Sequence, residues 1–291
     1  MNHPIHPVAT LPLKAGGEGS MGSILLELGK LRPIDVDRVL AQQQVFGQRF
    51  GEVARRLGLV SEEDIQQVLA RQFDYHYLQP GQGKYPPELV AAYQPFSEQM
   101  ETLRTVRTEL MQRWFGRGRK ALVVAGIGRG EGASFFAANL AVVLSQLNQR
   151  TLLIDANLRQ PRQHEIFNLK GRQGLSDILA SRAGAETFSK VDSFAHLSVL
   201  PAGTRPPNPQ ELISLASFSE LRESLGNRFD AILIDVPAFS VGADARTIAA
   251  RVGGVLLVCR NNKTSMADVN AVSAQLVRAD VEVVGSVLVD F

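Results

Sequence analysis

Cysteine is almost absent from this sequence, since Cys259 is the only one among 291 residues. A single thiol excludes an internal disulfide and is typical of a protein that folds in a reducing compartment. Cys259 ends the apolar run VGGVLLVC, which favours a buried strand position over a reactive thiol. No spacing of His and Cys suggests a zinc site.

Long hydrophobic runs are also missing. Residues 135–147 form one of the longest apolar stretches, and they are fewer than the ~20 residues that a membrane-spanning helix needs. The first residues lack the basic start and apolar core of a secretory signal. We therefore expect a cytoplasmic protein without a transmembrane segment.

Charge of one sign is not in excess, because 31 Lys and Arg face 29 Asp and Glu, a formal net charge of +2. This balance gives no electrostatic case for a nucleic-acid partner. Hydrophobic residues make up 45% of the chain, enough for a sizeable core. The length predicts one large domain and one small one.

The first part of the chain contains an internal repeat, in which residues 20–43 align with residues 49–72. Each copy begins with a short helix that ends at a glycine, Gly29 or Gly58. Glycine suits this position because it tolerates the left-handed conformation that closes a helix. A turn and a second amphipathic helix follow in each copy.

The second helices have recognisable starts. Pro33 sits where a first-turn proline is tolerated, and Ser61 with Asp64 resembles a capping box. We therefore predict a small all-α domain of tandem helical hairpins over 20–74, preceded by a flexible segment over 1–19.

Residues 75–96 differ in composition from both neighbours. They are rich in Gly, Pro and Tyr and lack steady periodicity, which is typical of a linker. The four tyrosines of the chain all lie here: Tyr75, Tyr77, Tyr85 and Tyr93. A helix is expected next, over about 97–115.

From residue 120 onward, apolar strand-like runs alternate with helical patterns. Alternation of this kind predicts an α/β domain over 97–291, with a mainly parallel sheet flanked by helices. The expected strands are ALVVAG (121–126), TLLIDA (151–156), LSVLPAG (197–203), AILIDVP (231–237), GVLLVCR (254–260) and VVGSVLV (283–289).

A glycine-rich loop, GIGRGEGAS, joins the first strand to a helix. In this order of elements, backbone N–H groups converge on phosphate oxygens at a helix N-terminus, which favours an anion. Gly132 and Ser134 match the P-loop pattern, but Ile127 replaces its first glycine and Ala133 its lysine. Taken alone, the loop is explained equally well as an ordinary glycine-rich turn.

Two aspartates end later strands, Asp155 in LLIDANLRQP and Asp235 in AILIDVPA. P-loop proteins hold Mg²⁺ at this sheet edge, together with a hydroxyl such as that of Ser134. Either aspartate alone could be a cap or turn residue. Both, in order behind the loop, predict a nucleotide and Mg²⁺ site.

Five segments in this order resemble the bacterial tyrosine kinase family: GRGEGAS, LLIDANLRQP, PAGTRPPNPQELI, ILIDVPA and CRNNKTSMADV. The resemblance covers 97–291 and implies ATP and Mg²⁺ as cofactors. It implies metal ligands at Ser134, Asp155 and Asp235, with Asp155 also the base toward a tyrosine hydroxyl. The residues that it places at the nucleotide are Gly128, Gly130, Glu131, Gly132, Ala133, Ser134 and Arg159.

The sequence departs from the family pattern at three places. Ala133 removes the lysine that offsets phosphate charge, and Arg129 is a candidate catalytic substitute, unless it simply faces solvent. Asn157 replaces the second aspartate of LLIDANLRQP. The sequence ends at SVLVDF without a tyrosine cluster, so the linker tyrosines are the expected phosphorylation sites.

The resemblance also implies partners. Glu101, Arg104 and Arg107 match the family's E-x-x-R-x-x-R helix, which packs subunits into a ring; an ordinary solvated face of i, i+3 charges is the alternative. The implied partner is a membrane-embedded polysaccharide co-polymerase, which would hold the protein at the inner membrane. The full chain resembles kinase-like chain-length determinants of exopolysaccharide loci.

The N-terminal repeats resemble the MshE N-terminal domain, which belongs to type II secretion E-type proteins and binds cyclic di-GMP. The matching residues of the second copy are Arg49, Phe50, Gly51, Gly58 and Gln72. The first copy has Ser20 where an arginine would stack on guanine, and this weakens the expected site. A protein-docking role for the repeats would look the same in sequence.

Three functions fit these features. The first is an ATP-binding tyrosine kinase-like regulator of exopolysaccharide polymerisation, chain length and export. The second is a catalytically weak or inactive nucleotide switch that relays cyclic di-GMP to the polysaccharide machinery. The third, a positioning ATPase of the MinD/ParA type, is disfavoured because Gly128 stands where that group has its signature lysine.

Overall fold

A computed structural model describes residues 20–72, 78 and 84–290. The described residues fall into two compact units, one within 1–76 and the other within 77–291. No helix in the described part has the length and apolarity needed to cross a bilayer.

The first unit contains the helices that the repeat predicts. They are α1 (Met21–Glu27), α2 (Pro33–Phe46), α3 (Phe50–Arg56) and α4 (Glu62–Gln72). Gly29 and Gly58 both have a φ of +67°, as their position after a helix requires. Ser61 and Asp64 form the expected reciprocal cap, in which each backbone N–H donates to the other side chain.

The two repeats pack against each other through equivalent positions. Phe50 lies over Gly22, where an added Cβ would come 3.3 Å from its ring. Met21 lies over Gly51, where an added Cβ would come 2.9 Å from the sulfur. Because each repeat leaves room for a side chain of the other, the two copies share one core.

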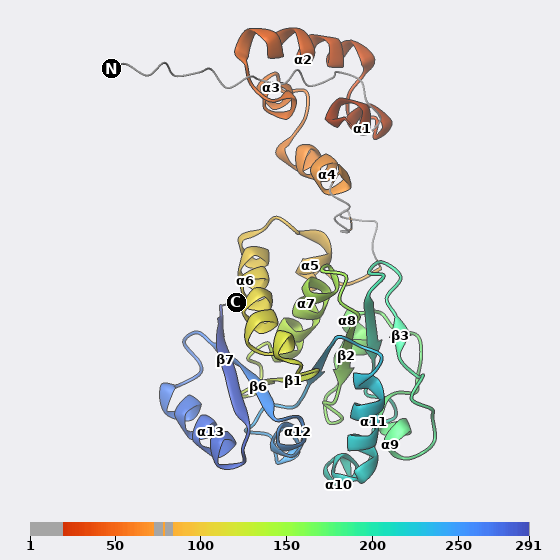
Figure 1. The fold of residues 1–291 in the computed structure, drawn as a ribbon, viewed down its shortest axis with the longest axis vertical. Coiled ribbons are helices and arrows are strands. Elements are labelled where there is room, and N and C mark those ends of the chain that lie inside the picture. Colours follow the sequence, from red (N-terminus) through yellow and green to blue (C-terminus); the bar gives the residue numbers. More distant parts are fainter. Residues whose placement is uncertain (1–19, 73–77, 79–83, 291) are drawn as a thin grey trace, which may run out of the picture. The chain divides into compact units, whose positions relative to one another are not determined.

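The second unit is built on a seven-stranded sheet of order β3-β4-β2-β5-β1-β6-β7 (Figure 1). All pairs are parallel except β3 with β4. The strands are β1 (Ala121–Gly126), β2 (Thr151–Asp155), β3 (Ser189–Lys190), β4 (Leu197–Leu200), β5 (Ala231–Asp235), β6 (Gly254–Arg260) and β7 (Glu282–Val289). The six predicted strands are confirmed, and the short antiparallel β3 is an addition.

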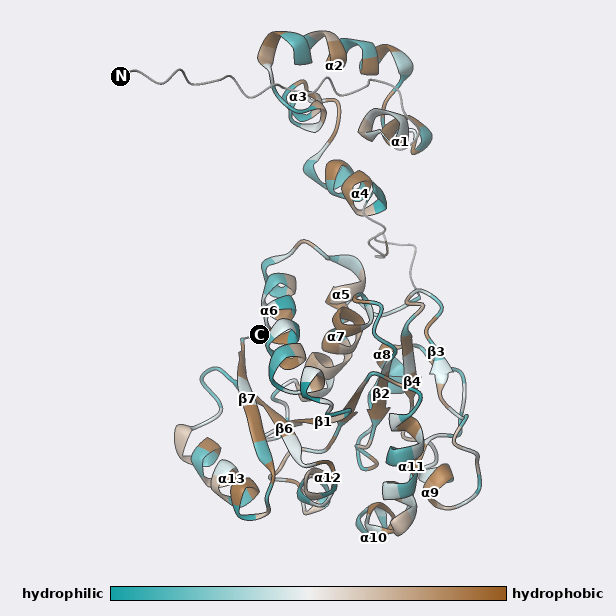
Figure 2. Ribbon diagram, in the orientation of Figure 1, coloured by the Kyte–Doolittle hydropathy of each residue, from teal (hydrophilic) through white to brown (hydrophobic). Residues whose placement is uncertain are grey.

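Helices cover both faces of this sheet, as predicted. One face carries α5 (Val90–Tyr93), α6 (Glu98–Arg113), α7 (Ala133–Ser145) and α8 (Gln163–Ile166). The other carries α9 (Leu175–Leu179), α10 (Pro209–Ser214), α11 (Ala216–Gly226), α12 (Asp244–Val252) and α13 (Met266–Arg278). Figure 2 shows hydrophobic strands between these layers. Cys259 is buried in β6, as its sequence context favours.

The linker prediction for 75–96 is wrong for its second half. The Tyr85 ring is buried against Phe167 and Phe194, and Ala91 donates its N–H to the Asn139 side chain at 2.8 Å. The segment from residue 84 onward is therefore part of the second unit. Its Pro and Gly content suggested a linker because these residues are common in irregular backbone, whether that backbone is exposed or packed against a domain.

Trp114, the only tryptophan, fixes the packing of the helix that precedes the sheet. Its side chain is 1% exposed, and its Nε1–H donates to the Ala121 carbonyl at 2.9 Å. A Cβ added at Gly254 would come 2.2 Å from the indole. The ring therefore requires glycine at the start of β6.

We expect Gly254→Ala to lower the free energy of unfolding by about 3 kcal/mol, because the indole has to move out of a filled core. Urea unfolding followed by tryptophan fluorescence measures this loss. Gly184→Ala is the matched control, since a Cβ there meets nothing within 4 Å. Equal unfolding midpoints for the two variants would contradict the expectation.

Candidate nucleotide and metal site

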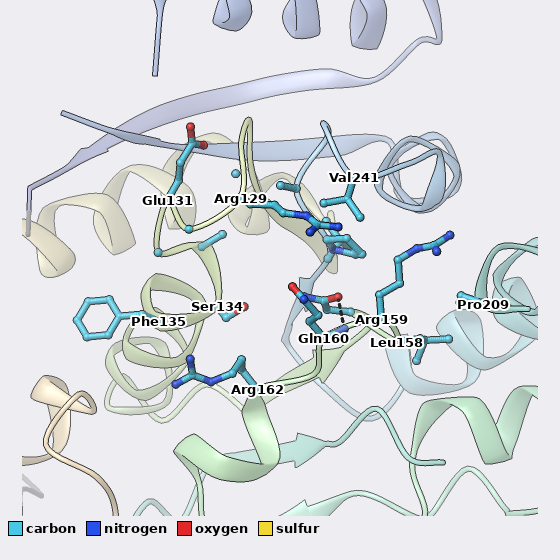
Figure 3. Close-up of a pocket in the computed structure, with 18 of the residues that line it drawn as sticks. Arg129, Glu131, Ser134, Phe135, Leu158, Arg159, Gln160, Arg162, Pro209 and Val241 are labelled. Atoms are coloured by element: carbon cyan, nitrogen blue, oxygen red, sulfur yellow. Dashed lines mark hydrogen bonds between the residues drawn. The ribbon is translucent and has the colours of Figure 1, made fainter. Parts of the chain in front are cut away.

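The glycine-rich loop lies between β1 and α7, at the carboxyl edge of the sheet (Figures 1 and 3). Gly130 and Gly132 have φ values of +71° and +77°, which residues with side chains rarely adopt. Gly132 is the N-cap of α7, so Ala133 and Ser134 are the first residues of that helix. The loop therefore has the strand, turn and helix start of a phosphate site.

A cavity of about 740 Å³ opens beside this loop. Its walls come from the loop, the segment after β2, the Pro-rich segment before α10 and the segment after β5. Four arginines line it: Arg129, Arg159, Arg162 and Arg205. Figure 3 shows Arg129 on the loop and Arg159 and Arg162 on the segment after β2, on different sides of Ser134. Since Glu88 and Glu131 are the acids in the lining, the cavity has an excess of positive charge that suits a phosphate-bearing ligand.

Glu131 is held by the loop itself. Its side chain is 3% exposed, Oε2 accepts from the Gly128 N–H at 2.9 Å, and Oε1 accepts from the Thr264 hydroxyl at 2.6 Å. The Gly128 N–H, which the sequence placed at a phosphate, is thus engaged by this carboxylate. Glu131 accordingly shapes the loop in this structure.

Asp155 and Asp235 lie side by side, because they are paired residues of the neighbouring strands β2 and β5. Both are fully buried. Asp155 accepts from three backbone N–H groups, those of Asn157, Arg162 and Gln163, at 3.1, 3.0 and 2.9 Å. Oδ2 of Asp235 accepts from Gln163 Nε2 at 2.8 Å, while Oδ1 has no hydrogen-bond partner.

Burial disfavours two ionised carboxylates at this position. Burial, followed by the charge of Asp235, raises the pKa of Asp155 to about 8. Burial also raises the pKa of Asp235, to about 6, against the opposing hydrogen bonds from Gln163 and Ser134. Such a pair favours a bound proton or a bound cation.

The donor set fits Mg²⁺. Asp155, Asp235 and the Ser134 hydroxyl offer hard oxygen atoms, and Oδ1 of Asp235 has no other partner. Among the described residues, no three or more His, Cys, Asp and Glu side chains are placed so that they could hold a metal ion together. A cation at this site would therefore keep several waters. Mg²⁺ is bound in this way beside phosphates.

Gln163 was not identified from the sequence. It is fully buried, and its Nε2 donates to both Asp235 and the Ser134 carbonyl, at 2.8 and 3.0 Å. Its own N–H donates to Asp155. One residue thus links all three expected metal ligands, two through its side chain and Asp155 through its backbone N–H. No sequence signal marks it, because glutamine in a turn is usually solvated.

Arg159 and Asn157 line the cavity, and in this structure both are held by other residues of the chain. Arg159 makes an ion pair with Asp244, which is 1% exposed, at 2.5 Å. Asn157 accepts from the Gln160 N–H at 3.1 Å and so shapes the turn after β2. Asp244 is a second residue that sequence reasoning missed, because it lies 85 positions from Arg159.

The expected oligomerisation residues lie on α6. Arg104 pairs with Glu101 and also donates to the Pro95 carbonyl. Arg107 donates to the Val143 carbonyl of α7 at 3.1 Å. Both arginines therefore bind backbone carbonyls of the same chain, which an ordinary solvated helix face would not require.

Two of the expected phosphorylation sites are packed. Tyr85 is 6% exposed and its hydroxyl donates to Ser193 at 3.2 Å. The Tyr93 hydroxyl donates to the Tyr85 carbonyl at 2.8 Å. Modification of Tyr85 would therefore require local unfolding, and its phosphorylation stays a prediction. Tyr75 and Tyr77 lie outside the described residues.

The residues expected to bind cyclic di-GMP lie in the first unit. Arg49, Gly58 and Gln72 are exposed, Phe50 is half-buried and Gly51 is buried. Arg49 occupies the N-cap of α3, the position that Ser20 holds at α1.

The sheet, the glycine-rich loop and the paired carboxylates define a P-loop nucleotide-binding protein of the α/β class. A family model for cellulose biosynthesis protein BcsQ matches residues 119–276. The putative tyrosine-protein kinase CapB of Staphylococcus aureus is 33% identical over 67% of this chain and 85% of its own length. The kinase domain of Escherichia coli tyrosine kinase ETK superimposes with a TM-score of 0.67 at 28% identity, over 74% of this chain and 84% of that domain. The chain therefore belongs to the bacterial tyrosine kinase family.

Other relatives are much longer. Tyrosine-protein kinase wzc of Salmonella typhi is 32% identical over 69% of this chain, which spans 28% of that protein's length. The similarity to wzc therefore concerns one part of it.

Proposed function

We propose that this protein is an ATP- and Mg²⁺-binding, tyrosine kinase-like regulator of exopolysaccharide polymerisation, chain length and export. The observation that carries the proposal is the buried pair of Asp155 and Asp235 beside a phosphate loop in an arginine-lined cavity. Membership of the tyrosine kinase family supports it.

Each site residue has a proposed role. Ser134, Asp155 and, through water, Asp235 would hold Mg²⁺, and Asp155 would accept the proton of the tyrosine hydroxyl. Mg²⁺, when bound, supplies positive charge, which favours the ionised carboxylates and offsets the negative charge of the phosphates. Arg129 and Arg159 face the same cavity and add to its positive charge.

The proposed partner is a membrane-embedded polysaccharide co-polymerase, which would hold this protein at the cytoplasmic side of the inner membrane. Support comes from relatives such as the putative tyrosine-protein kinase EpsB of Ralstonia solanacearum and a putative kinase in the cps region of Klebsiella pneumoniae. A homo-oligomeric ring through Glu101, Arg104 and Arg107 is part of the same proposal.

The proposal predicts that the full chain binds ATP only with Mg²⁺ and labels a tyrosine-containing peptide. Calorimetry measures binding, and an anti-phosphotyrosine blot measures transfer. Asp155→Asn should abolish labelling, because it removes both a metal ligand and the base. Binding by the wild type without labelling would overturn the enzyme half of the proposal.

The second candidate is a nucleotide switch that relays cyclic di-GMP without turnover. Two observations favour it: Ala133 leaves the loop without its lysine, and Arg49 is exposed at the N-cap of α3. Calorimetry with cyclic di-GMP on the wild type and on Arg49→Ala tests the first step. Equal binding heats for the wild type and Arg49→Ala would contradict a cyclic di-GMP site at Arg49.

A further inference from the structure

The segment after β6 contains the motif CRNNKTS, to which neither the fold nor the proposed chemistry has given a role. It lies against the phosphate loop. Lys263 Nζ donates to the carbonyls of Arg129 and Gly130 at 2.5 and 3.3 Å, and Arg260 Nη1 donates to the Gly130 carbonyl at 3.2 Å. Two cations from a distant segment thus bind consecutive carbonyls of the loop.

These contacts bear on the direction of the loop amides. A phosphate loop binds anions when its N–H groups point inward, and its carbonyls then point outward. A cation that holds a carbonyl also fixes the peptide N–H on the other side of the same plane. Lys263 and Arg260 therefore orient the amides that follow Arg129 and Gly130, those of Gly130 and Glu131.

Gly130 makes this approach feasible. A Cβ at this position would lie 3.1 Å from Lys263 Nζ, and its φ of +71° already disfavours a side chain. The glycine thus serves two purposes at once, a left-handed turn and room for the lysine.

Thr264, in the same segment, controls the acid of the loop. Its hydroxyl donates to Glu131 at 2.6 Å and accepts from the Arg260 N–H at 2.8 Å. Figure 3 shows Glu131 directed away from Ser134. A carboxylate that would repel phosphate is thereby held by the segment that supplies the cations.

We propose that Lys263, supported by Arg260, takes over part of the task of the missing loop lysine by bracing the loop from its carbonyl side. This inference rests on the proposed nucleotide function. Lys263 is a positioning residue, because it acts through the amides of the loop.

The test compares ATP, ADP and adenosine binding by calorimetry on the full chain with Mg²⁺. Lys263→Met should weaken ATP binding at least tenfold and leave adenosine binding unchanged, because the brace serves the phosphates alone. Lys263→Arg should stay within about threefold of the wild type. Lys190→Met is the charge-matched control, since Lys190 is exposed on β3 at the opposite edge of the sheet.

A double variant separates this role from a merely structural one. If Lys263 serves part of the task of the missing lysine, Lys263→Met should weaken ATP binding less in the Ala133→Lys background than in the wild type. Equal losses for ATP and adenosine, or a loss with Arg129→Met and none with Lys263→Met, would overturn the proposal.

A readout without nucleotide keeps the inference distinct from the proposed function. In crystals of the nucleotide-free protein, Lys263→Met should turn the Arg129–Gly130 and Gly130–Glu131 peptide planes away from their wild-type orientation, because the cation that holds the two carbonyls is gone. If the wild type binds no ATP, the proposed function fails, and this comparison still decides whether the brace exists. Unchanged peptide orientations would refute it.

Discussion

Ala133→Lys is expected to raise the rate of ATP turnover by the full chain at least tenfold. Ala133 is the first residue of α7, directly after the N-cap Gly132, and it lines the cavity. A lysine there would therefore extend toward the phosphates. A cation at this place stabilises the charge on the transferring phosphoryl group. A tenfold gain corresponds to about 1.4 kcal/mol of barrier, a modest share of what such cations contribute.

Ala216→Lys is the control for this gain. Ala216 is the first residue of α11 and is exposed, so the change adds the same charge at a helix start away from the loop. Phosphate release measures turnover in both variants and in the wild type. An unchanged rate in Ala133→Lys would contradict the expectation and favour the nucleotide switch, with Asn157 as the next departure to reverse.

The second large effect is a loss of stability with rising pH in the metal-free protein. Asp155 and Asp235 have folded-state pKa values of about 8 and about 6, above the ordinary value of 3.8. The folded state therefore binds more protons than the unfolded state between pH 4 and 8. The contribution of these two groups to the free energy of unfolding is fully present below about pH 4. It is lost as the pH rises through the folded-state pKa values of about 6 and about 8. Asp230 does not add to this trend, because Arg150 lowers its pKa to about 2.

Urea unfolding between pH 5 and pH 8.5 measures this decline, expected to be on the order of 3 kcal/mol. Asp155→Asn should remove most of it, because one neutral amide ends the repulsion between two buried charges. Mg²⁺ with nucleotide should flatten the decline in the wild type and leave Asp155→Asn unaffected. A pH profile shared by wild type and variant would contradict the assignment.

Local sequence determined much of the fold. The strands were predictable because each is a short apolar run between turn signals, and their alternation with helices leaves a parallel sheet as the solution. Gly29 and Gly58 were predictable because left-handed positions favour one residue type. β3 escaped prediction, since two residues carry no periodicity. Tyr85 escaped because its partners, Phe167 and Phe194, are distant in sequence.

The same division holds for the candidate site. The sequence by itself determined the loop, Ser134 and the two aspartates, because each is fixed by its own strand or helix end. Only the tertiary structure decided that Gln163 links the metal ligands, that Asp244 pairs with Arg159 and that Lys263 binds the loop. These contacts form between segments whose local patterns are independent. They depend on the crossover order of the sheet, which brings the ends of β2, β5, β1 and β6 to one edge.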